Sequence, residues 1–169
     1  LVEPDVDKAE ELFLLQHFLL RYEFFSDPAK DTETLYQDIL PKLVRYGALE
    51  EVDGSYQCVS QARLKELAGL TQNFLESYLL TLRAASGYRS RDISRKELPK
   101  KIQEFGKARL AIDEIVRPES LSIVNIKNAI RAYREESILQ FSIDGSGMKF
   151  DEDGLKIYQN VLERLIYNS

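Results

Sequence analysis

The chain has 169 residues, 44% hydrophobic and 30% charged, which is the balance of an ordinary globular protein rather than a disordered one. Its net charge of −5 argues against nucleic acid as a partner. A single cysteine excludes an internal disulfide framework, and a single histidine excludes a His-dependent triad or a multi-histidine metal site. No apolar run approaches the about 18–20 residues that a membrane span needs. We therefore assign no metal, no cofactor and no catalytic residue from composition.

The N-terminal part predicts two helices after a linker. Residues 1–7 form an acidic, proline-containing run that is typical of a linker from an upstream domain. A broad apolar stripe predicts a helix over about 8–25, ended by Ser-Asp-Pro. A second helix is expected to begin near Thr32 and to end at Gly47, a residue that suits a helix C-cap. Pro41 inside this helix predicts a kink or an early break.

The apolar pattern then changes from helical to strand periodicity. The dipeptide Asp53-Gly54 separates two short strand-like stretches and predicts a β-hairpin. Cys58 lies in its second strand, where a buried and inert thiol is expected. Ser60 is expected to cap a long helix that continues to about Ala85. His17, between apolar neighbours on the first helix, is interpreted as a partly buried, hydrogen-bonded side chain.

The C-terminal half predicts three more helices and a second hairpin. In chain order we expect a helix over about 97–115, a turn and cap at 117–122, a helix that carries residues 124–133, strands at 138–143 and 148–150 around a turn at 144–147, and a final helix over about 151–167. The turn at 144–147 begins like a phosphate loop or a calcium loop but lacks the residues that would complete either, so we interpret it as a hairpin turn.

Two stretches share the order helix, hairpin, helix. They run from Leu35 to Leu82 and from Ile126 to Tyr167, and Leu49 matches Leu139, Gly54 matches Gly145 and Tyr56 matches Phe150. This is the layout of a winged-helix unit and indicates an internal duplication. The sequence therefore predicts a mainly α fold with two small β-hairpins (α+β), built as a helical domain with two winged-helix-like helix–hairpin–helix units.

The predicted domain organisation has four parts. They are the linker at 1–7, a helical unit with the first hairpin at 8–86, a basic connecting segment and helix at 87–116, and the second helix–hairpin–helix unit at 117–169.

Positive charge is concentrated in one part of the chain. Residues 88–109 hold eight basic and three acidic residues, a net charge of +5, so the rest of the chain carries −10. One interpretation is a solvated face, as for most charge runs. The other is a contact surface for anionic lipid headgroups or phosphate, for which the candidate residues are Arg89, Arg91, Arg95, Lys96, Lys100 and Lys101.

Several short segments, in this order, resemble a known family. They are 19–25 (LLRYEFF), 43–49 (LVRYGAL), 74–79 (FLESYL) with Arg83, and 117–122 (RPESLS) with Asn128-Ala129. Together they look like the C-terminal region of the membrane-associated glycerol-3-phosphate acyltransferases of the bacterial and mitochondrial type, with their dihydroxyacetone-phosphate relatives. The resemblance covers the chain from about Leu12 to Leu165, and the order and spacing of the segments carry it.

The resemblance implies a parent enzyme that transfers a fatty acyl group from acyl-CoA or acyl carrier protein to the 1-hydroxyl of glycerol 3-phosphate in phospholipid synthesis. The family's His-x4-Asp motif is not matched here, because Tyr22 stands where an Asp would follow His17. The resemblance thus implies that the catalytic domain lies N-terminal to Leu1, and no catalytic residue is carried over. It implies a membrane-associated protein on the cytoplasmic side of the bacterial inner membrane or the mitochondrial outer membrane.

On this basis we expect a non-catalytic domain that supports the upstream catalytic domain of the same chain and contacts an anionic membrane surface. The alternative from another class is an acidic tandem winged-helix protein-interaction module, which explains the apparent duplication equally well. A winged-helix DNA binder is disfavoured, because the helix at 34–46 has only Lys42 and Arg45 against Asp38.

Overall fold

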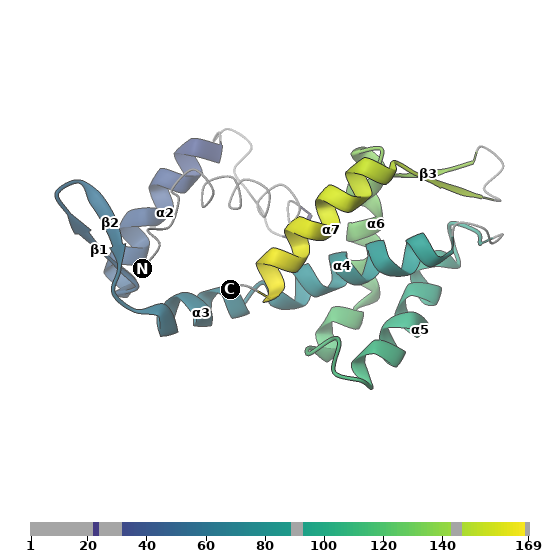
Figure 1. The fold of residues 1–169 in the computed structure, drawn as a ribbon, viewed down its shortest axis with the longest axis horizontal. Coiled ribbons are helices and arrows are strands. Elements are labelled where there is room, and N and C mark those ends of the chain that lie inside the picture. Colours follow the sequence, from purple (N-terminus) through teal and green to yellow (C-terminus); the bar gives the residue numbers. More distant parts are fainter. Residues whose placement is uncertain (1–21, 24–31, 89–92, 143–146, 168–169) are drawn as a thin grey trace. The chain divides into compact units, whose positions relative to one another are not determined.

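The structure is a computed structural model that describes residues 22–23, 32–88, 93–142 and 147–167 (Figure 1). It is mainly helical with two small antiparallel two-stranded sheets, which confirms the predicted α+β class. The chain divides into two units, one ending at Thr71 and the other beginning at Gln72. The sequence predicts a boundary at 86/87 instead. The difference arises because the helix that begins at Gln72 forms the interior of the second unit.

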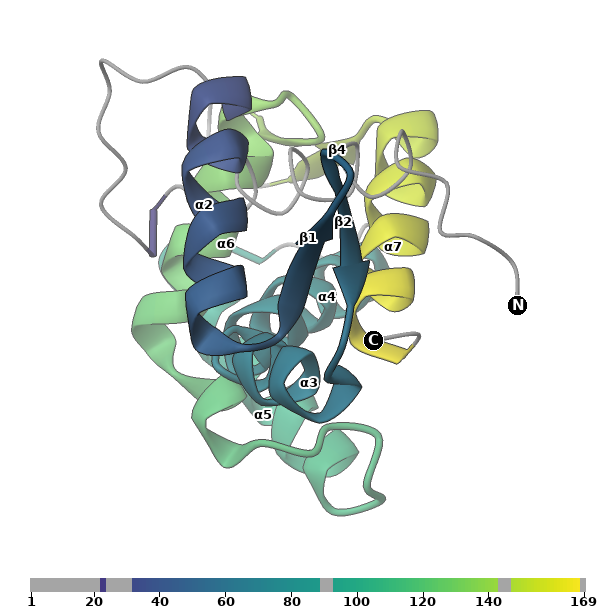
Figure 2. The same cartoon turned by 90° about the vertical axis from the view of Figure 1, so that its left-hand side faces the viewer.

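The first unit contains α2 (Thr32–Tyr46), the hairpin of β1 (Leu49–Val52) and β2 (Ser55–Cys58), and α3 (Gln61–Gly69). Figure 2 shows α2 beside this hairpin, and α2 packs against β1. The helix continues through Pro41, so the predicted early break is wrong. Leu40 on one side of the proline and Leu43 on the other are buried or half-buried, and their packing offsets the one backbone hydrogen bond that the proline removes.

Gly47 ends α2 as predicted. Its N–H donates to the Val44 carbonyl (2.8 Å) and the Ala48 N–H donates to the Leu43 carbonyl (3.0 Å). Gly47 has φ +75°, so this is a Schellman motif, which favours glycine at this position. The guanidinium of Arg63 in α3 also donates to the Tyr46 carbonyl at the end of α2.

The predicted Asp53-Gly54 hairpin is confirmed. Leu49 pairs with Cys58, and the strands are joined by Asp53 (φ 51°) and Gly54 (φ 77°). Two successive positive φ angles are the geometry of a type I′ turn, which matches the twist of the flanking strands. The expectation that Cys58 is buried is wrong: every residue of β2 is exposed, the thiol included.

The predicted single helix from Ser60 to Ala85 is two helices. Ser60 caps α3 as expected, accepting the Arg63 N–H at 3.4 Å. The helix ends at Gly69, where the Leu70 N–H turns back to the Leu67 carbonyl (3.0 Å) and the Thr71 hydroxyl donates to the Ala68 carbonyl (3.1 Å). These tighter three-residue bonds replace the helical spacing and end α3 before α4 begins.

The second unit is built around α4 (Gln72–Gly87). The other elements are α5 (Leu98–Leu110), the 3-10 turn η1 (Pro118–Leu121), α6 (Ile123–Glu135), the hairpin of β3 (Leu139–Phe141) and β4 (Met148–Phe150), and α7 (Glu152–Tyr167). α4 packs against α5, α6, α7 and η1, and ten of its residues are buried (Figure 1). A helix covered on this many sides forms the core rather than a face of it.

Two predicted boundaries in this unit are too long. α5 ends at Leu110 rather than near 115. The chain turns away from the helix there, because Asp113 adopts the left-handed conformation (φ 56°) and the Glu114 N–H donates back to the Arg109 carbonyl (3.0 Å). β3 covers residues 139–141, so residues 138 and 142 of the predicted strand are not part of it, and residue 143 lies outside the described residues. The cap at Ser122, the returning strand and the final helix lie where the sequence predicts them.

The helix–hairpin–helix order occurs in both units. α6 ends as α2 does: Ser137 (φ 60°) donates to Arg134 (3.1 Å), and Ile138 donates to Tyr133 (2.9 Å). A β-strand follows at once in both cases, beginning at Leu49 and at Leu139.

The strand register corrects one of the predicted matches. Phe150 pairs with Leu139 just as Cys58 pairs with Leu49, so Phe150 corresponds to Cys58 and not to Tyr56. Gly145 and the turn around it lie outside the described residues, as do His17 and the predicted first helix up to Arg21. The winged-helix assignment stays a prediction.

Candidate functional site

The predicted basic segment leads into the start of α5. Arg95, Lys96 and Lys100 are exposed, and Lys101 is exposed and paired with Glu104 (3.0 Å), whose hydrogen bond raises the Lys101 pKa. Arg89 and Arg91 lie outside the described residues.

The start of α5 is held by a reciprocal pair of side chains. The Ser94 hydroxyl donates to the Glu97 carboxylate (2.7 Å) and the Ser94 N–H donates to it as well (3.3 Å), while the Glu97 N–H donates to the Ser94 oxygen (3.3 Å). This is the arrangement of a capping box. These hydrogen bonds to Ser94 lower the pKa of Glu97. Arg95 and Lys96 lie between the two paired residues, so their backbone is fixed at the helix start.

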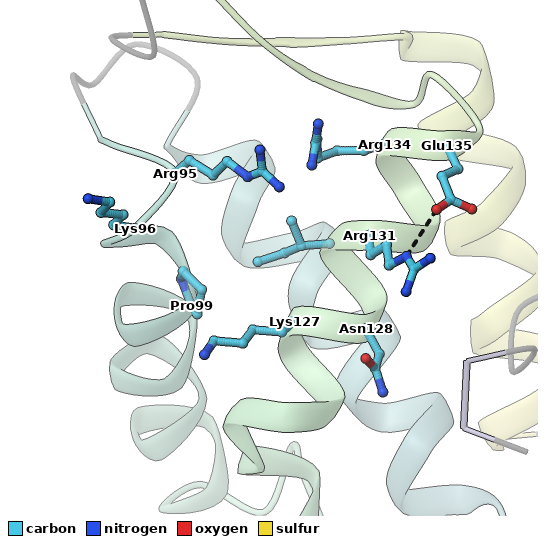
Figure 3. A pocket seen from close by; sticks show the side chains of 9 residues that line it. Arg95, Lys96, Pro99, Lys127, Asn128, Arg131, Arg134 and Glu135 are labelled. Carbon is cyan, nitrogen blue, oxygen red and sulfur yellow. Dashed lines mark hydrogen bonds and ion pairs between the residues drawn. The ribbon is translucent and has the colours of Figure 1, made fainter.

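A basic pocket lies where the start of α5 faces α6 (Figure 3). Its volume is about 790 Å³, and it is open to solvent. The residues that line it, which define the basic pocket from here on, are Arg95, Lys96, Pro99, Lys127, Asn128, Ile130, Arg131, Arg134 and Glu135. Five of these side chains are cations and one is an acid.

The α6 side of the basic pocket is a stripe of cations. Lys127, Arg131 and Arg134 are spaced at i, i+4 and i+7, which places them on one face of the helix. Ile126 and Tyr133, among other residues of the same helix, are buried in the unit. Because those side chains anchor α6, the cations are held on its outer face.

The stick view shows how the cations point. Arg95 and Arg134 extend toward one another from opposite sides of the pocket, and Lys127 extends toward Pro99 in α5 (Figure 3). Arg131 turns to Glu135, with which it forms an ion pair of 3.0 Å. Lys96 lies at the outer edge, and its ammonium group points away from the others.

The pocket therefore contains two of the six predicted contact residues, Arg95 and Lys96. Lys100 and Lys101 do not line it. Lys127, Arg131 and Arg134 were not among the predicted residues, because they lie outside the basic cluster at 88–109 along the chain. Their helical spacing was the available signal.

The segments at 74–79 and 117–122 meet inside the second unit. The carboxylate of Glu76, which is only 5% exposed, accepts the Ser120 hydroxyl (2.7 Å) and the Arg117 N–H (3.2 Å). It also accepts the side-chain amide of Gln72 (3.0 Å), and the Ser77 hydroxyl donates to the Ser120 carbonyl (2.7 Å). These buried polar groups satisfy one another and join α4 to η1.

Arg83 forms a second link. Its guanidinium pairs with Glu114 after α5 (2.9 Å) and with Glu163 in α7 (2.9 Å). Glu114 also pairs with Arg109 (2.7 Å). The side chains of these ion pairs are only partly exposed, and they tie three elements of the second unit together.

Neither a metal cluster nor a membrane-spanning helix occurs in the part of the chain that the structure describes. There, no three side chains of the His, Cys, Asp and Glu types converge, and every helix is too short or too polar to cross a bilayer.

The fold and the site together define a helical α+β domain with ordered internal polar links and a cationic surface pocket. The chain belongs to the family described as the glycerol-3-phosphate acyltransferase C-terminal region, whose model matches residues 6–142. The resemblance seen in the sequence is thereby confirmed. No curated protein matches the chain.

Proposed function

We propose that this chain is the non-catalytic C-terminal domain of a glycerol-3-phosphate 1-O-acyltransferase and that it supports the catalytic domain of the same protein. The parent enzyme would transfer a fatty acyl group from acyl-CoA or acyl carrier protein to glycerol 3-phosphate. The family match supports the acyltransferase parent. The observation that carries the supporting role is the hydrogen-bonded junction of Glu76 with Arg117 and Ser120, in which two family-like segments serve to join elements of the domain.

The test is acyl transfer by the full-length parent with glycerol 3-phosphate and acyl-CoA, with and without residues 1–169. We expect activity to be lost without these residues and restored when they are supplied in cis or in trans. The matched internal test compares Glu76→Ala with Glu119→Ala, because Glu76 of α4 is buried in the junction and Glu119 is exposed on η1, the 3-10 turn that the junction holds. Full activity without residues 1–169 would contradict the supporting role.

We propose further that the exposed cations at the start of α5 contact an anionic membrane surface on the cytoplasmic side. The charge supports this proposal, since residues 88–109 carry +5 in a chain of −5. Each Lys or Arg near an anionic surface contributes about 1 kcal/mol of binding. Lys100 is exposed and has no ion pair within the described residues.

Vesicle co-sedimentation tests the membrane contact. With phosphatidylcholine vesicles that contain phosphatidylglycerol, we expect Lys100→Glu/Lys101→Glu to weaken binding by about tenfold or more. Lys42→Glu/Arg45→Glu makes the same change of charge at exposed positions of α2 and should have a smaller effect. Equal effects of the two pairs would show that net charge alone governs vesicle binding and would contradict the proposal. Charge reversal at Arg91, Arg95, Lys100 and Lys101 together should also lower the activity of the parent.

The repeated helix–hairpin–helix order favours a second candidate, an acidic tandem winged-helix module that binds another protein. The two orders share the same helix terminus, at Gly47 and at Ser137, followed by a strand. A parent without acyltransferase activity would favour this module over the enzyme domain.

A further inference from the structure

We infer that the basic pocket binds a phosphate group carried by a small organic body or a lipid headgroup, with Arg95, Lys127 and Arg134 as its principal ligands. This inference goes beyond the proposed function. It concerns a bounded pocket between α5 and α6, and its test needs no acyltransferase activity.

Charge is the first argument. Of the five cations in the basic pocket, Arg131 is paired with Glu135. In the described part of the chain, Arg95, Lys96, Lys127 and Arg134 form no ion pair with a carboxylate. Elsewhere in this unit Arg83 and Arg109 are both paired with acids. The basic pocket therefore concentrates positive charge from four cations that have no carboxylate partner in the described residues.

Orientation is the second argument. Arg95 and Arg134 come from different elements and point toward one another across the pocket (Figure 3). Two guanidinium groups that face each other repel, and a bound anion between them converts this repulsion into attraction on both sides. Arg134 also lies over the ring of Phe141, 5.9 Å from its centre, which holds the arginine in place.

Shape is the third argument, and it favours phosphate over a simple inorganic halide. Guanidinium groups match the oxygens of phosphate in bidentate pairs, and lysine adds a compact charge. Pro99 and Ile130, which are largely buried in the fold, form the apolar part of the pocket lining. A volume of about 790 Å³ exceeds what one phosphate occupies and lies within the range of small-molecule sites. The room left over suits an organic body attached to the phosphate.

The helix face is preformed for this ligand. Ser94 and Glu97 fix the chain around Arg95, and the buried Ile126, Ile130 and Tyr133 anchor α6. Binding then orders only side chains and not backbone, so little conformational entropy opposes it.

The first arm of the test uses inorganic phosphate as the probe. The 169-residue chain is titrated at constant ionic strength, with sodium chloride as the matched salt, and backbone amide NMR shifts are recorded. We expect saturable shifts at residues 95–99 and 127–135. Lys127→Gln/Arg134→Gln should weaken binding by about tenfold or more, since charge-assisted hydrogen bonds are lost. Lys100→Gln/Lys101→Gln also removes two positive charges, but from positions on α5 outside the pocket. It should weaken phosphate binding by less than about threefold, because salt screens these more distant charges.

A conservative variant separates site geometry from folding. Arg134→Lys keeps the charge and removes the planar fork, so its affinity should lie between that of the native chain and that of the double variant. Amide spectra of the variants without phosphate report whether each one is folded. The inference is overturned if the shifts do not saturate, if chloride produces the same shifts, or if the two double variants lose affinity equally.

The second arm distinguishes the source of the phosphate. Phosphatidylcholine vesicles with and without phosphatidic acid are co-sedimented with the native chain and with Lys127→Gln/Arg134→Gln. If the double variant loses binding to phosphatidic acid as well as to free phosphate, the pocket holds a lipid headgroup. If it loses only the free phosphate, the pocket holds a soluble organic phosphate. Either result supports the site, whereas unchanged binding in both assays contradicts it.

Discussion

At the scale of single residues, the carboxylate of Glu76 is buried inside the second unit together with the Ser120 hydroxyl, to which it is hydrogen-bonded. A carboxylate that is 5% exposed is costly to bury unless donors surround it. Ser120, Arg117 and Gln72 supply three such donors. The burial of charge is thus offset by hydrogen bonds that also hold η1 against α4.

We predict that Glu76→Ala destabilises the domain by about 3 kcal/mol, because it leaves the buried Ser120 hydroxyl and the half-buried Arg117 N–H without an acceptor. The free energy of unfolding from urea denaturation measures the change. The exposed Glu119→Ala should change it by less than about 0.5 kcal/mol. A loss at Glu76 no larger than that at Glu119 would show that the junction is not a source of stability.

Gly106 gives a second prediction at this scale. A Cβ there would meet side-chain carbons of Leu121 and, at 2.7 Å, of Leu80. Although alanine is the better helix former by about 1 kcal/mol, overpacking costs about 1–3 kcal/mol, so Gly106→Ala should destabilise the domain. Gly87, at the end of α4, has nothing within 4 Å of its Cβ position, and Gly87→Ala should be neutral or stabilising. Thermal unfolding of the two variants compares them, and the same sign of change for both would contradict the close approach at Gly106.

At the scale of elements, Arg83 joins α4 to α7 and to the loop after α5. Its two ion pairs, with Glu114 and Glu163, lie where the side chains are between 27% and 32% exposed. Partly exposed pairs of this kind contribute about 1 kcal/mol, more than fully exposed ones, because water screens them less. The same reasoning applies to Arg109, which shares Glu114.

The Arg83–Glu163 pair predicts how stability changes with pH. Hydrogen bonds from Gln159 and then from Arg83 lower the pKa of Glu163. Because the folded-state pKa lies below the ordinary glutamate value of about 4.3, the stability from this pair is complete above about pH 4.3 and is lost as the pH falls through the folded value. In Arg83→Met this loss should be smaller, and stability near pH 7 should fall by about 1 kcal/mol.

The measurement is the free energy of unfolding from pH 7 to pH 3 in native protein and in Arg83→Met. Arg164→Met, at an exposed position of α7, serves as the matched control. Parallel pH curves for Arg83→Met and the native chain would contradict the assigned role of the pair.

At the scale of the whole molecule, the division between Thr71 and Gln72 separates two units whose described residues differ in the number of buried hydrophobic side chains. Among the described residues, the buried hydrophobic side chains of the first unit are Leu40 and Ala48, whereas the second contains the other members of the core, from Leu75 to Leu162. A core of this size is the main source of cooperative stability.

We therefore predict that residues 72–169, expressed alone, fold and unfold cooperatively on heating. Circular dichroism would follow the transition, and residues 32–71 expressed alone provide the comparison, with a weak or absent transition expected. A non-cooperative transition for residues 72–169 would show that its core is not sufficient.

Local chemistry made much of this protein predictable from the sequence alone. Periodicity identified α2, α5, α6 and α7, and Asp53-Gly54 identified the first hairpin. Gly47 identified the end of α2, and Ser60 and Ser122 identified the caps of the helices that follow them. Each of these signals depends on residues within one turn of the chain, where backbone sterics and capping act directly. The order of the family-like segments, in the same way, was sufficient to indicate the family.

Only the three-dimensional structure decided the features that the linear pattern of apolar and charged residues does not specify. Periodicity did not show the break between α3 and α4, because the three-residue hydrogen bonds at Leu70 and Thr71 interrupt an apolar pattern that continues across them. The exposure of Cys58 is decided by what packs against β2 and not by the type of the residue. The basic pocket is the clearest case. Its cations belong to two segments that are 31 to 39 residues apart along the chain, and the packing of α5 against α6 brings them to one place.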